Sequence, residues 1–450
     1  MGEDDGVTEA ETEDAPTPPP EPPSAPAAPP TRSDAALGRY RARMRRGRIV
    51  YFSIVGAVVV ALVVSVAVAW SRGEASHASL RTFAPAPSTI GIEAPSPAPQ
   101  RAWQTTDRIA LGVPQWGGTV ITFSDHTVGG RDARTGKRTW SYTRSDRTVC
   151  TAAQATNTTI AVFANRGNCD EVNAFDSDTG RRRWTRTLDK DGMPIDGTPS
   201  YQVLPFTFMV TSDTTIYAID PVTGLDRWTY YRYGCHVDGA ALGSAGALIG
   251  QTCSQQVRCK GLKFCATGPQ LLFRDGSKGN GNDNDANRDQ VKWQRRGEFG
   301  RPVSADQVTS TLGTDGTLNL FAVEDGQQLQ RIALRSGSSV TGPVTAAATS
   351  SVEVIWAAGR TYAIQLGRAT PVWTAVSSAP PTVVSTTNEQ VPTAGTARIT
   401  VPLPDGIGLL DGNDGRVAQK FSVPVAPGST VYSLGTGFLV AGTNGITAYR

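Results

Sequence analysis

Two hydrophobic patterns divide this chain of 450 residues. From Ile49 to Trp70 the sequence IVYFSIVGAVVVALVVSVAVAW contains no charged residue and is apolar on every side of a helix. At 1.5 Å per residue such a helix is roughly 33 Å long, enough to cross the hydrocarbon core of a bilayer. Beyond about residue 100, short runs of β-branched and aromatic residues alternate with turn residues. The pattern predicts one membrane-spanning helix, 49–70, followed by an all-β domain.

The segments on either side of the apolar run suggest an orientation. Residues 1–48 begin with an acidic, proline-rich stretch that we expect to be disordered, because it cannot bury enough apolar surface. Six arginines follow directly before the helix: Arg39, Arg41, Arg43, Arg45, Arg46 and Arg48. The positive-inside rule then predicts a cytoplasmic N-terminus and a β domain, 101–450, outside the plasma membrane, joined by a Pro- and Ala-rich stalk, 71–100. A cleaved signal peptide is the alternative.

A repeat runs through the β domain. The segments RDARTGKRTW, FDSDTGRRRW and IDPVTGLDRW end at Trp140, Trp184 and Trp228, and their Thr-Gly glycines lie 44 residues apart. Each unit reads as a strand, an Asp-containing turn, a glycine and a second strand with tryptophan. A period of this length is typical of propeller blades. Long runs with helical periodicity are absent, which argues against a helical repeat.

The number of repeats predicts how the ring closes. The tryptophan position recurs at 103, 140, 184, 228, 293, 330, 373 and 419, with glutamine at 330 and 419. Trp103 has no such strand before it, and the last strand, Gly445–Arg450, has none after it. We therefore predict an eight-bladed β-propeller whose last blade is completed by the Trp103 strand, because this pairing protects sheet edges.

The repeat resembles that of a known family. Ala174, Asp176, Thr179, Gly180 and Trp184, with their counterparts in other units, resemble the tryptophan-docking repeat of pyrroloquinoline-quinone-type β-propellers. That family includes the quinoprotein alcohol dehydrogenases and the propeller lipoprotein of the bacterial outer-membrane barrel-assembly machine. The resemblance implies that each tryptophan packs between adjacent blades. These structural docking residues are Trp103, Trp140, Trp184, Trp228, Trp293 and Trp373.

All six cysteines lie in the part that the topology places outside the membrane. An even number in an oxidising compartment predicts three disulfides. Separations of 19 and 18 residues favour Cys150–Cys169 and Cys235–Cys253, each on neighbouring strands of one blade, and leave Cys259–Cys265. Cys235–Cys265 with Cys253–Cys259 is the alternative. A zinc site is disfavoured because no Cys-x-x-Cys pair occurs.

Few residues are candidates for other chemistry. The insertion 277–289 contains alternating oxygen donors that resemble the start of a calcium loop: Asp283, Asp285, Asn287 and Asp289. Arg288 and Gln294 occupy the places where that loop has Gly and Glu, so a solvated loop is the simpler interpretation. The three histidines are far apart in the sequence, and a net charge of +3 argues against nucleic-acid binding.

The sequence does not support a quinoprotein enzyme. Family dehydrogenases are similar in having adjacent cysteines against the cofactor, whereas the closest pair here is Cys259 and Cys265. We therefore expect no cofactor and no catalysis, because function has to be argued from a site. The favoured function is a membrane-anchored interaction scaffold that binds an envelope protein or a wall component. The alternative is a quinone- or ligand-dependent redox or sensor protein that uses the central channel.

Overall fold

The computed structural model describes residues 32–72, 74–83, 96–112, 118–165, 167–188, 195, 197–232, 234–254, 267–276, 291–334, 345–348, 352–384, 398–434 and 437–450. The chain consists of two units, Met1–Ser76 and His77–Arg450. Each unit is described by itself.

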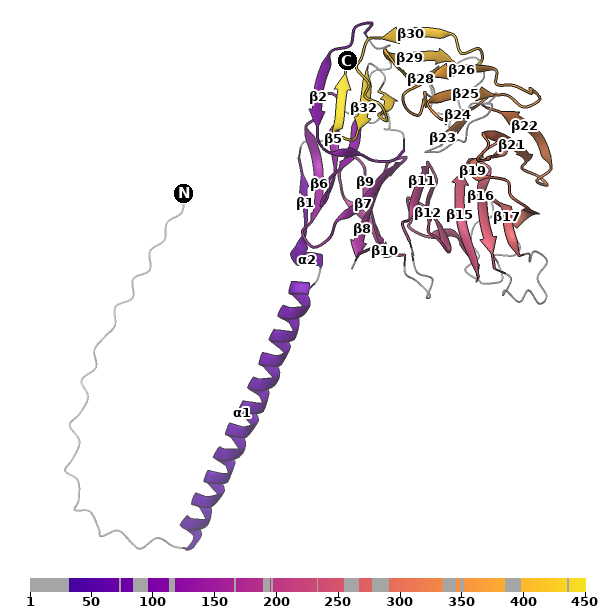
Figure 1. Cartoon of the computed structure of the whole chain (residues 1–450). Helices are drawn as coiled ribbons and strands as arrows, with labels where there is room; N and C mark the ends of the chain where they lie inside the picture. Colours follow the sequence, from indigo (N-terminus) through magenta and orange to yellow (C-terminus); the bar gives the residue numbers. More distant parts are fainter. Residues whose placement is uncertain are drawn as a thin grey trace, which may run out of the picture. The chain divides into compact units, whose positions relative to one another are not determined.

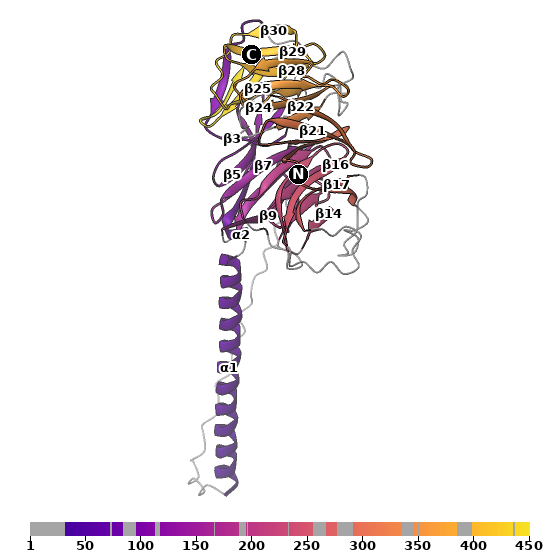
Figure 2. The same ribbon diagram turned by 45° about the vertical axis from the view of Figure 1, so that its right-hand side comes forward.

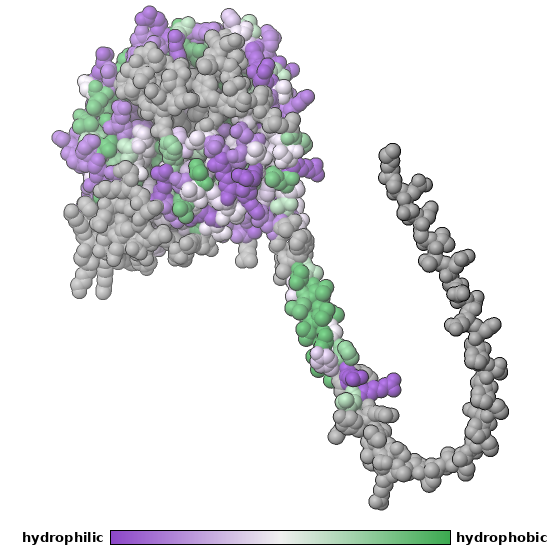
Figure 3. Space-filling view, turned by 180° about the vertical axis from the view of Figure 1, so that it is seen from behind, coloured by the Kyte–Doolittle hydropathy of each residue, from purple (hydrophilic) through white to green (hydrophobic). Residues whose placement is uncertain are grey.

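The first unit contains one long helix, α1 (Arg32–Arg72). Its segment Val50–Val68 has a mean hydropathy of 2.6 and is entirely exposed, and Figure 3 shows its hydrophobic side chains gathered along the helix. Length and composition make it a candidate membrane span. The helix begins at Arg32, earlier than the apolar run, so it includes the arginine cluster that precedes the predicted span. A short helix, α2 (Glu74–His77), follows in the sequence.

The second unit is an eight-bladed β-propeller (Figure 1; Figure 2). Every blade contains an antiparallel sheet, and from blade two to blade eight the first strand of each blade contacts the first strand of the next around the centre. Blades one to four consist of β3 (Arg108–Ile109), β4 (Thr119–Phe123), β5 (Thr127–Asp132) and β6 (Arg138–Arg144); β7 (Val149–Ala155), β8 (Thr158–Asn165), β9 (Asn168–Asp176) and β10 (Arg182–Thr187); β11 (Ser200–Leu204), β12 (Thr207–Thr211), β13 (Thr215–Ile219) and β14 (Asp226–Tyr231); and β15 (Cys235–Leu242), β16 (Gly246–Cys253), β17 (Gly268–Asp275) and β18 (Val291–Arg296).

The other four blades repeat this order, and the last blade takes its outer strand from the start of the domain. Blades five to eight consist of β19 (Arg301–Ala305), β20 (Val308–Leu312), β21 (Thr317–Ala322) and β22 (Gln328–Ala333); β23 (Thr345–Ala348), β24 (Glu353–Ala357), β25 (Arg360–Ile364) and β26 (Trp373–Val376); β27 (Thr382–Val384), β28 (Arg398–Leu403), β29 (Gly406–Asp411) and β30 (Val417–Phe421); and β31 (Thr430–Ser433), β32 (Phe438–Gly442), β33 (Gly445–Tyr449) and β2 (Arg101–Thr105).

The burial of the strands explains their composition. The middle strands β4 and β13 are buried at every residue, because both faces of a blade pack against neighbouring blades. The outer strand β14 has only two buried residues, Trp228 and Tyr230. Apolar clusters therefore fill the seams between blades. One of them joins Trp140 and Tyr142 of blade one to Ala161, Phe163 and Phe175 of blade two.

Ring closure through Trp103 is confirmed. In β2, Trp103 lies opposite Ala448 and Thr105 lies opposite Ile446 of β33. The backbones of Gln100 and Arg450 exchange two further hydrogen bonds, of 2.5 and 2.8 Å. The ends of the propeller sequence thus meet in blade eight, which removes the two free edges that an open ring would have.

The propeller begins earlier than the sequence predicts. Residues 78–82, assigned to a stalk, form β1 (Ala78–Thr82), which pairs with β6 along its whole length and makes blade one five-stranded. The pairing extends to a bond of 2.7 Å from Phe83 N–H to the Thr139 carbonyl. The segment was missed because ASLRT is mostly exposed and shows no burial pattern, so backbone pairing alone positions it.

Two disulfides are present, Cys150–Cys169 and Cys235–Cys253, the pairs that the sequence favours. The second joins neighbouring strands, where Cys235 and Cys253 lie directly opposite each other. The first does not: Cys150 is in β7 and Cys169 in β9, on either side of β8. A register shift between Val149 and Thr151 accompanies this crossing. Cys259 and Cys265 lie outside the described residues.

The closure geometry gives a first prediction. Replacing Trp103 by Ala should lower the free energy of unfolding of the full chain by about 3–5 kcal/mol, because a buried indole is lost at the closing seam. Arg101→Ala on the same strand is the control, since Arg101 is exposed and should change stability by less than about 0.5 kcal/mol. Urea denaturation in detergent measures both. Equal effects would show that Trp103 does not hold the ring closed.

Candidate functional site: the docking-turn face

In blades one, two, three and seven, an aspartate organises the turn between the third and fourth strands. In blade two, Asp176 Oδ1 accepts hydrogen bonds from the N–H (3.0 Å) and the Oγ1 (2.8 Å) of Thr179. Gly180 N–H donates to the Asp176 carbonyl, and Asp176 N–H donates to the Arg181 carbonyl, each at 2.8 Å. Gly180 has a φ of +70°, in the left-handed region that favours glycine. Asp, Thr and Gly of the repeat are therefore the parts of one turn.

Neighbouring residues stabilise the ionised form of the Asp176 carboxyl group. Burial raises its pKa, but the hydrogen bonds from Arg183 and Thr179 outweigh this and leave the pKa below the ordinary value. The Arg183 guanidinium lies 2.8 Å from Oδ2. The same turn recurs at Asp132, Asp220 and Asp411, each of which accepts backbone N–H groups on Oδ1.

The tryptophan of the preceding blade binds this turn. Trp140 Nε1 donates a hydrogen bond of 2.7 Å to the carbonyl of Ser177, the residue after Asp176. The indole covers Gly180 so closely that a Cβ there would lie 2.6 Å from Trp140 Cδ2. Position 180 therefore requires glycine for two reasons: the backbone has a positive φ, and the indole of Trp140 leaves no room for a Cβ. The equivalent bonds are Trp103 to Ala133 (2.9 Å) and Trp184 to Pro221, Trp293 to Val323 and Trp373 to Gly412 (3.0 Å each).

Two of the described seams depart from this arrangement, and a third is described only in part. In that third seam Arg274 Cζ lies 4.7 Å from the ring centroid of Trp228, and the turn after β17 lies outside the described residues. Gln330 replaces tryptophan, and its amide donates to the Arg368 carbonyl and accepts from Gly367 N–H at 3.0 Å. At the position of Gln419 there is no turn to bind, because the third and fourth strands of blade eight, β33 and β2, are not consecutive in the chain.

The turns of all blades gather on one side of the propeller. In an antiparallel sheet of four strands, the connection between strands one and two and that between strands three and four lie at the same edge. We call this side the docking-turn face. By the same topology, Cys150, Cys169, Cys235 and Cys253 lie at the opposite edge.

Blade three exposes apolar side chains on the docking-turn face. Phe206, in the β11–β12 turn, is 52% exposed, and Val222 and Leu225, in the β13–β14 turn, are 46% and 65% exposed. The equivalent positions in blades one and two hold exposed polar residues: Arg134 and Asp178 in place of Val222, and Lys137 and Arg181 in place of Leu225. Comparison of these repeat positions was the signal that could have identified the patch from the sequence.

The other predicted sites remain as predictions. Asp283, Asp285, Asn287 and Asp289 lie outside the described residues. Within the described part of the chain, no group of three or more His, Cys, Asp or Glu side chains is arranged to hold a metal ion. The predicted docking roles of Trp103, Trp140, Trp184, Trp293 and Trp373 correspond to the contacts given above. The indole of Trp228 contacts Arg274, and the turn after β17 lies outside the described residues.

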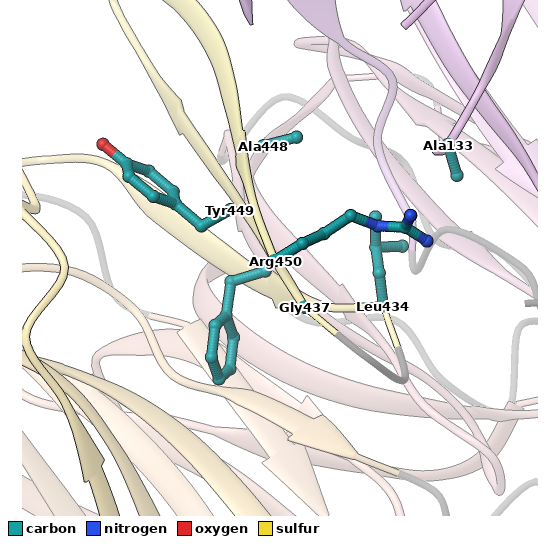
Figure 4. Close-up of a pocket in the computed structure, with 7 residues that line it drawn as sticks. Ala133, Leu434, Gly437, Ala448, Tyr449 and Arg450 are labelled. Carbon is teal, nitrogen blue, oxygen red and sulfur yellow. The ribbon is translucent and has the colours of Figure 1, made fainter. Parts of the chain in front are cut away.

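A hollow marks the closing seam between blades eight and one (Figure 4). It is too narrow to hold a water molecule, and the Arg450 side chain points across it toward Ala133 (Figure 4). Its other lining residues are Leu434, Gly437, Phe438, Ala448 and Tyr449. This hollow is therefore a gap in packing at the seam and has no room for a cofactor.

The comparisons with known proteins agree with the repeat. A protein family described as "Outer membrane protein assembly factor BamB" matches residues 100–196 and 124–257. The chain carries propeller repeats of the pyrroloquinoline-quinone-like type. This type of repeat also accounts for the aspartate turn, the glycine and the tryptophan of the seams.

Solved structures with a similar architecture are distant in sequence. The crystal structure of BamB from Moraxella catarrhalis has 16% identity and a TM-score of 0.46, covering 77% of this chain and 97% of that one. The computationally designed Ika8 protein has 12% identity and a TM-score of 0.49, covering 78% and 98%. The search of curated proteins found no match.

The close contact in the quinone-type repeat gives a second prediction. Gly180→Ala should destabilise the propeller by about 1–3 kcal/mol more than Gly167→Ala, because only Gly180 lies against an indole. Gly167 is a matched control: its φ is +92°, and a Cβ there would meet nothing within 4 Å. Both variants carry the strain of a left-handed alanine, so their difference in unfolding free energy reports the contact. A difference near zero would contradict it.

Proposed function

We propose that this protein is a membrane-anchored, non-enzymatic scaffold that binds a protein partner on the docking-turn face of its propeller. The observation that carries the proposal is the exposed apolar set Phe206, Val222 and Leu225 on blade three. Solvent-exposed turns tend to be polar, and grouped apolar residues on a surface mark sites of protein interaction. The description of the matched family as an assembly factor supports a role together with other proteins.

The backbone that carries these side chains is rigid. The carbonyl of Pro205, next to Phe206, accepts a hydrogen bond of 2.9 Å from Thr156 Oγ1 of blade two. Val222 N–H donates to Asp220 Oδ1 at 2.9 Å, and Trp184 Nε1 donates to the Pro221 carbonyl in the same turn. A surface whose loops are already fixed loses little conformational entropy on binding.

The proposed location is the outer side of the plasma membrane. The apolar span Val50–Val68 and the arginines before it support a single-pass anchor with a cytoplasmic N-terminus. Two disulfides in the propeller support an oxidising compartment. The partner is then an envelope protein or a wall component that meets the propeller from outside.

Site-specific cross-linking tests the interaction surface. A photoreactive residue at Leu225 should give one discrete product in intact cells, and replacing Phe206 and Val222 by Ser should reduce its yield at least about tenfold, as expected for the loss of buried apolar contacts. Leu329, on β22 of blade five, is the control because it is a leucine with 43% exposure away from the patch. The same product from both positions, or a yield unchanged by the Ser variants, would contradict the surface.

Protease accessibility tests the topology separately. An epitope fused after Arg450 should be removed when protease is added to wall-stripped cells, while an epitope before Met1 should stay intact until the cells are lysed. The arginines before the span are the physical reason for this asymmetry. Protection of the C-terminal epitope in intact cells would reverse the orientation.

A further inference from the structure

The seam between blades five and six contains a buried carboxyl group that the docking repeat does not use. Glu353 begins β24 of blade six and is only 8% exposed. Its Oε1 accepts a hydrogen bond of 2.9 Å from Ser310 Oγ, and Ser310, on β20 of blade five, is fully buried. The carboxyl group therefore crosses the seam and is part of the contact between the two blades.

The surroundings of Glu353 favour its neutral form. Oε2 is buried and has no hydrogen-bond partner among the described residues. A second acidic group, Asp306 in the β19–β20 turn, acts on Glu353 with the same sign of charge. Both carboxylate oxygens of Asp306 accept hydrogen bonds: Oδ1 from Ser244 N–H at 2.7 Å, and Oδ2 from Ser304 Oγ at 3.2 Å. A carboxylate at Glu353 would thus be buried beside a like charge.

The outer part of the same seam lacks the indole found in most others. Gln330 stands in the tryptophan position and binds the turn of blade six through its amide at Gly367 and Arg368. Gln330 is only partly buried, whereas Trp140 is fully buried in its seam. This seam accordingly depends more on the contacts around Glu353 than a seam with a docked tryptophan would.

We propose that Glu353 makes the seam between blades five and six a pH-sensitive joint, closed while its carboxyl group is protonated and loosened when the group ionises. Burial, with Asp306 nearby, raises the pKa of Glu353 to about 7, although hydrogen bonds from Ser310 and Ser304 oppose the rise. An acid whose pKa is higher in the closed state than in the open state stabilises closure at low pH. The joint should therefore loosen progressively as the pH rises from the ordinary glutamate pKa, about 4.3, to about 7, and should change no further above pH 7. This device is independent of the proposed scaffold function.

Hydrogen exchange on the full chain in detergent tests the joint. Amide exchange of peptides from β20 and β24, corrected for the intrinsic rate, should speed up by as much as tenfold for each pH unit between the ordinary glutamate pKa of about 4.3 and about pH 7, and should level off above pH 7. Peptides from β12 and β13 of blade three provide the internal reference, because that seam holds Trp184 in its docking position. They should show no such change.

The variant Glu353→Gln keeps the shape of the side chain and cannot ionise. It should hold β20 and β24 protected up to pH 9 and should melt at a higher temperature than the native chain at pH 8.5, with the difference disappearing below about pH 4. A native chain whose β20 and β24 exchange does not depend on pH would overturn the proposal, even if the variant failed to fold. A Glu353→Gln variant that kept the native pH dependence would overturn it as well.

Discussion

The contact between an indole and the turn of the next blade is the interaction on which the propeller depends. In five seams the tryptophan donates a hydrogen bond to the residue after the turn's first position and lies against its glycine. One side chain thereby satisfies a carbonyl, fills the seam and fixes the distance between two sheets. The aspartate, threonine and glycine of the repeat matter because they hold the turn in the form that receives this ring.

The closing blade shows the same interaction across the two ends of the domain. Trp103 belongs to β2, far from blade eight in the sequence, yet it completes blade eight and binds the turn of blade one through the Ala133 carbonyl. Where the indole is missing, other groups fill the seam. At the seam of blades seven and eight, where Gln419 has no turn to bind, the ring centroids of Phe421 and Phe438 lie 4.7 Å apart. At the seam of blades five and six, the polar contacts of Gln330 and Glu353 take its place.

The features that recur in every repeat could be predicted from the sequence. Features that depend on the pairing of a single strand or on the path of a single disulfide could not. Trp103 without a preceding strand and Gly445–Arg450 without a following one were sufficient to predict the closure, because the period fixes the number of blades. The segment ASLRT was missed, since an exposed strand is positioned by backbone bonds that leave no pattern in the sequence. The disulfide pairs followed from spacing, but not the crossing of β8 by Cys150–Cys169, which depends on a local register shift.

The candidate site was predictable to a smaller extent. Val222 and Leu225 occupy turn positions that look ordinary in a single unit and stand out only when aligned with Lys137 and Arg181. Glu353 gives no signal, because one glutamate before a strand is usually solvated, and only the fold places Ser310 opposite it. Buried polar contacts between blades depend on the relative position of two sheets, which a repeat period does not specify.

A double-mutant cycle between Trp140 and Gly180 tests the central interaction most directly. The unfolding free energies of the native chain, Trp140→Ala, Gly180→Ala and the double variant give the coupling between the two positions. If the glycine exists to receive the indole, Gly180→Ala should cost at least about 1 kcal/mol less once Trp140 is absent, because only backbone strain remains. Additive effects within about 0.3–0.5 kcal/mol would show that the ring and the glycine act independently, and would contradict the account.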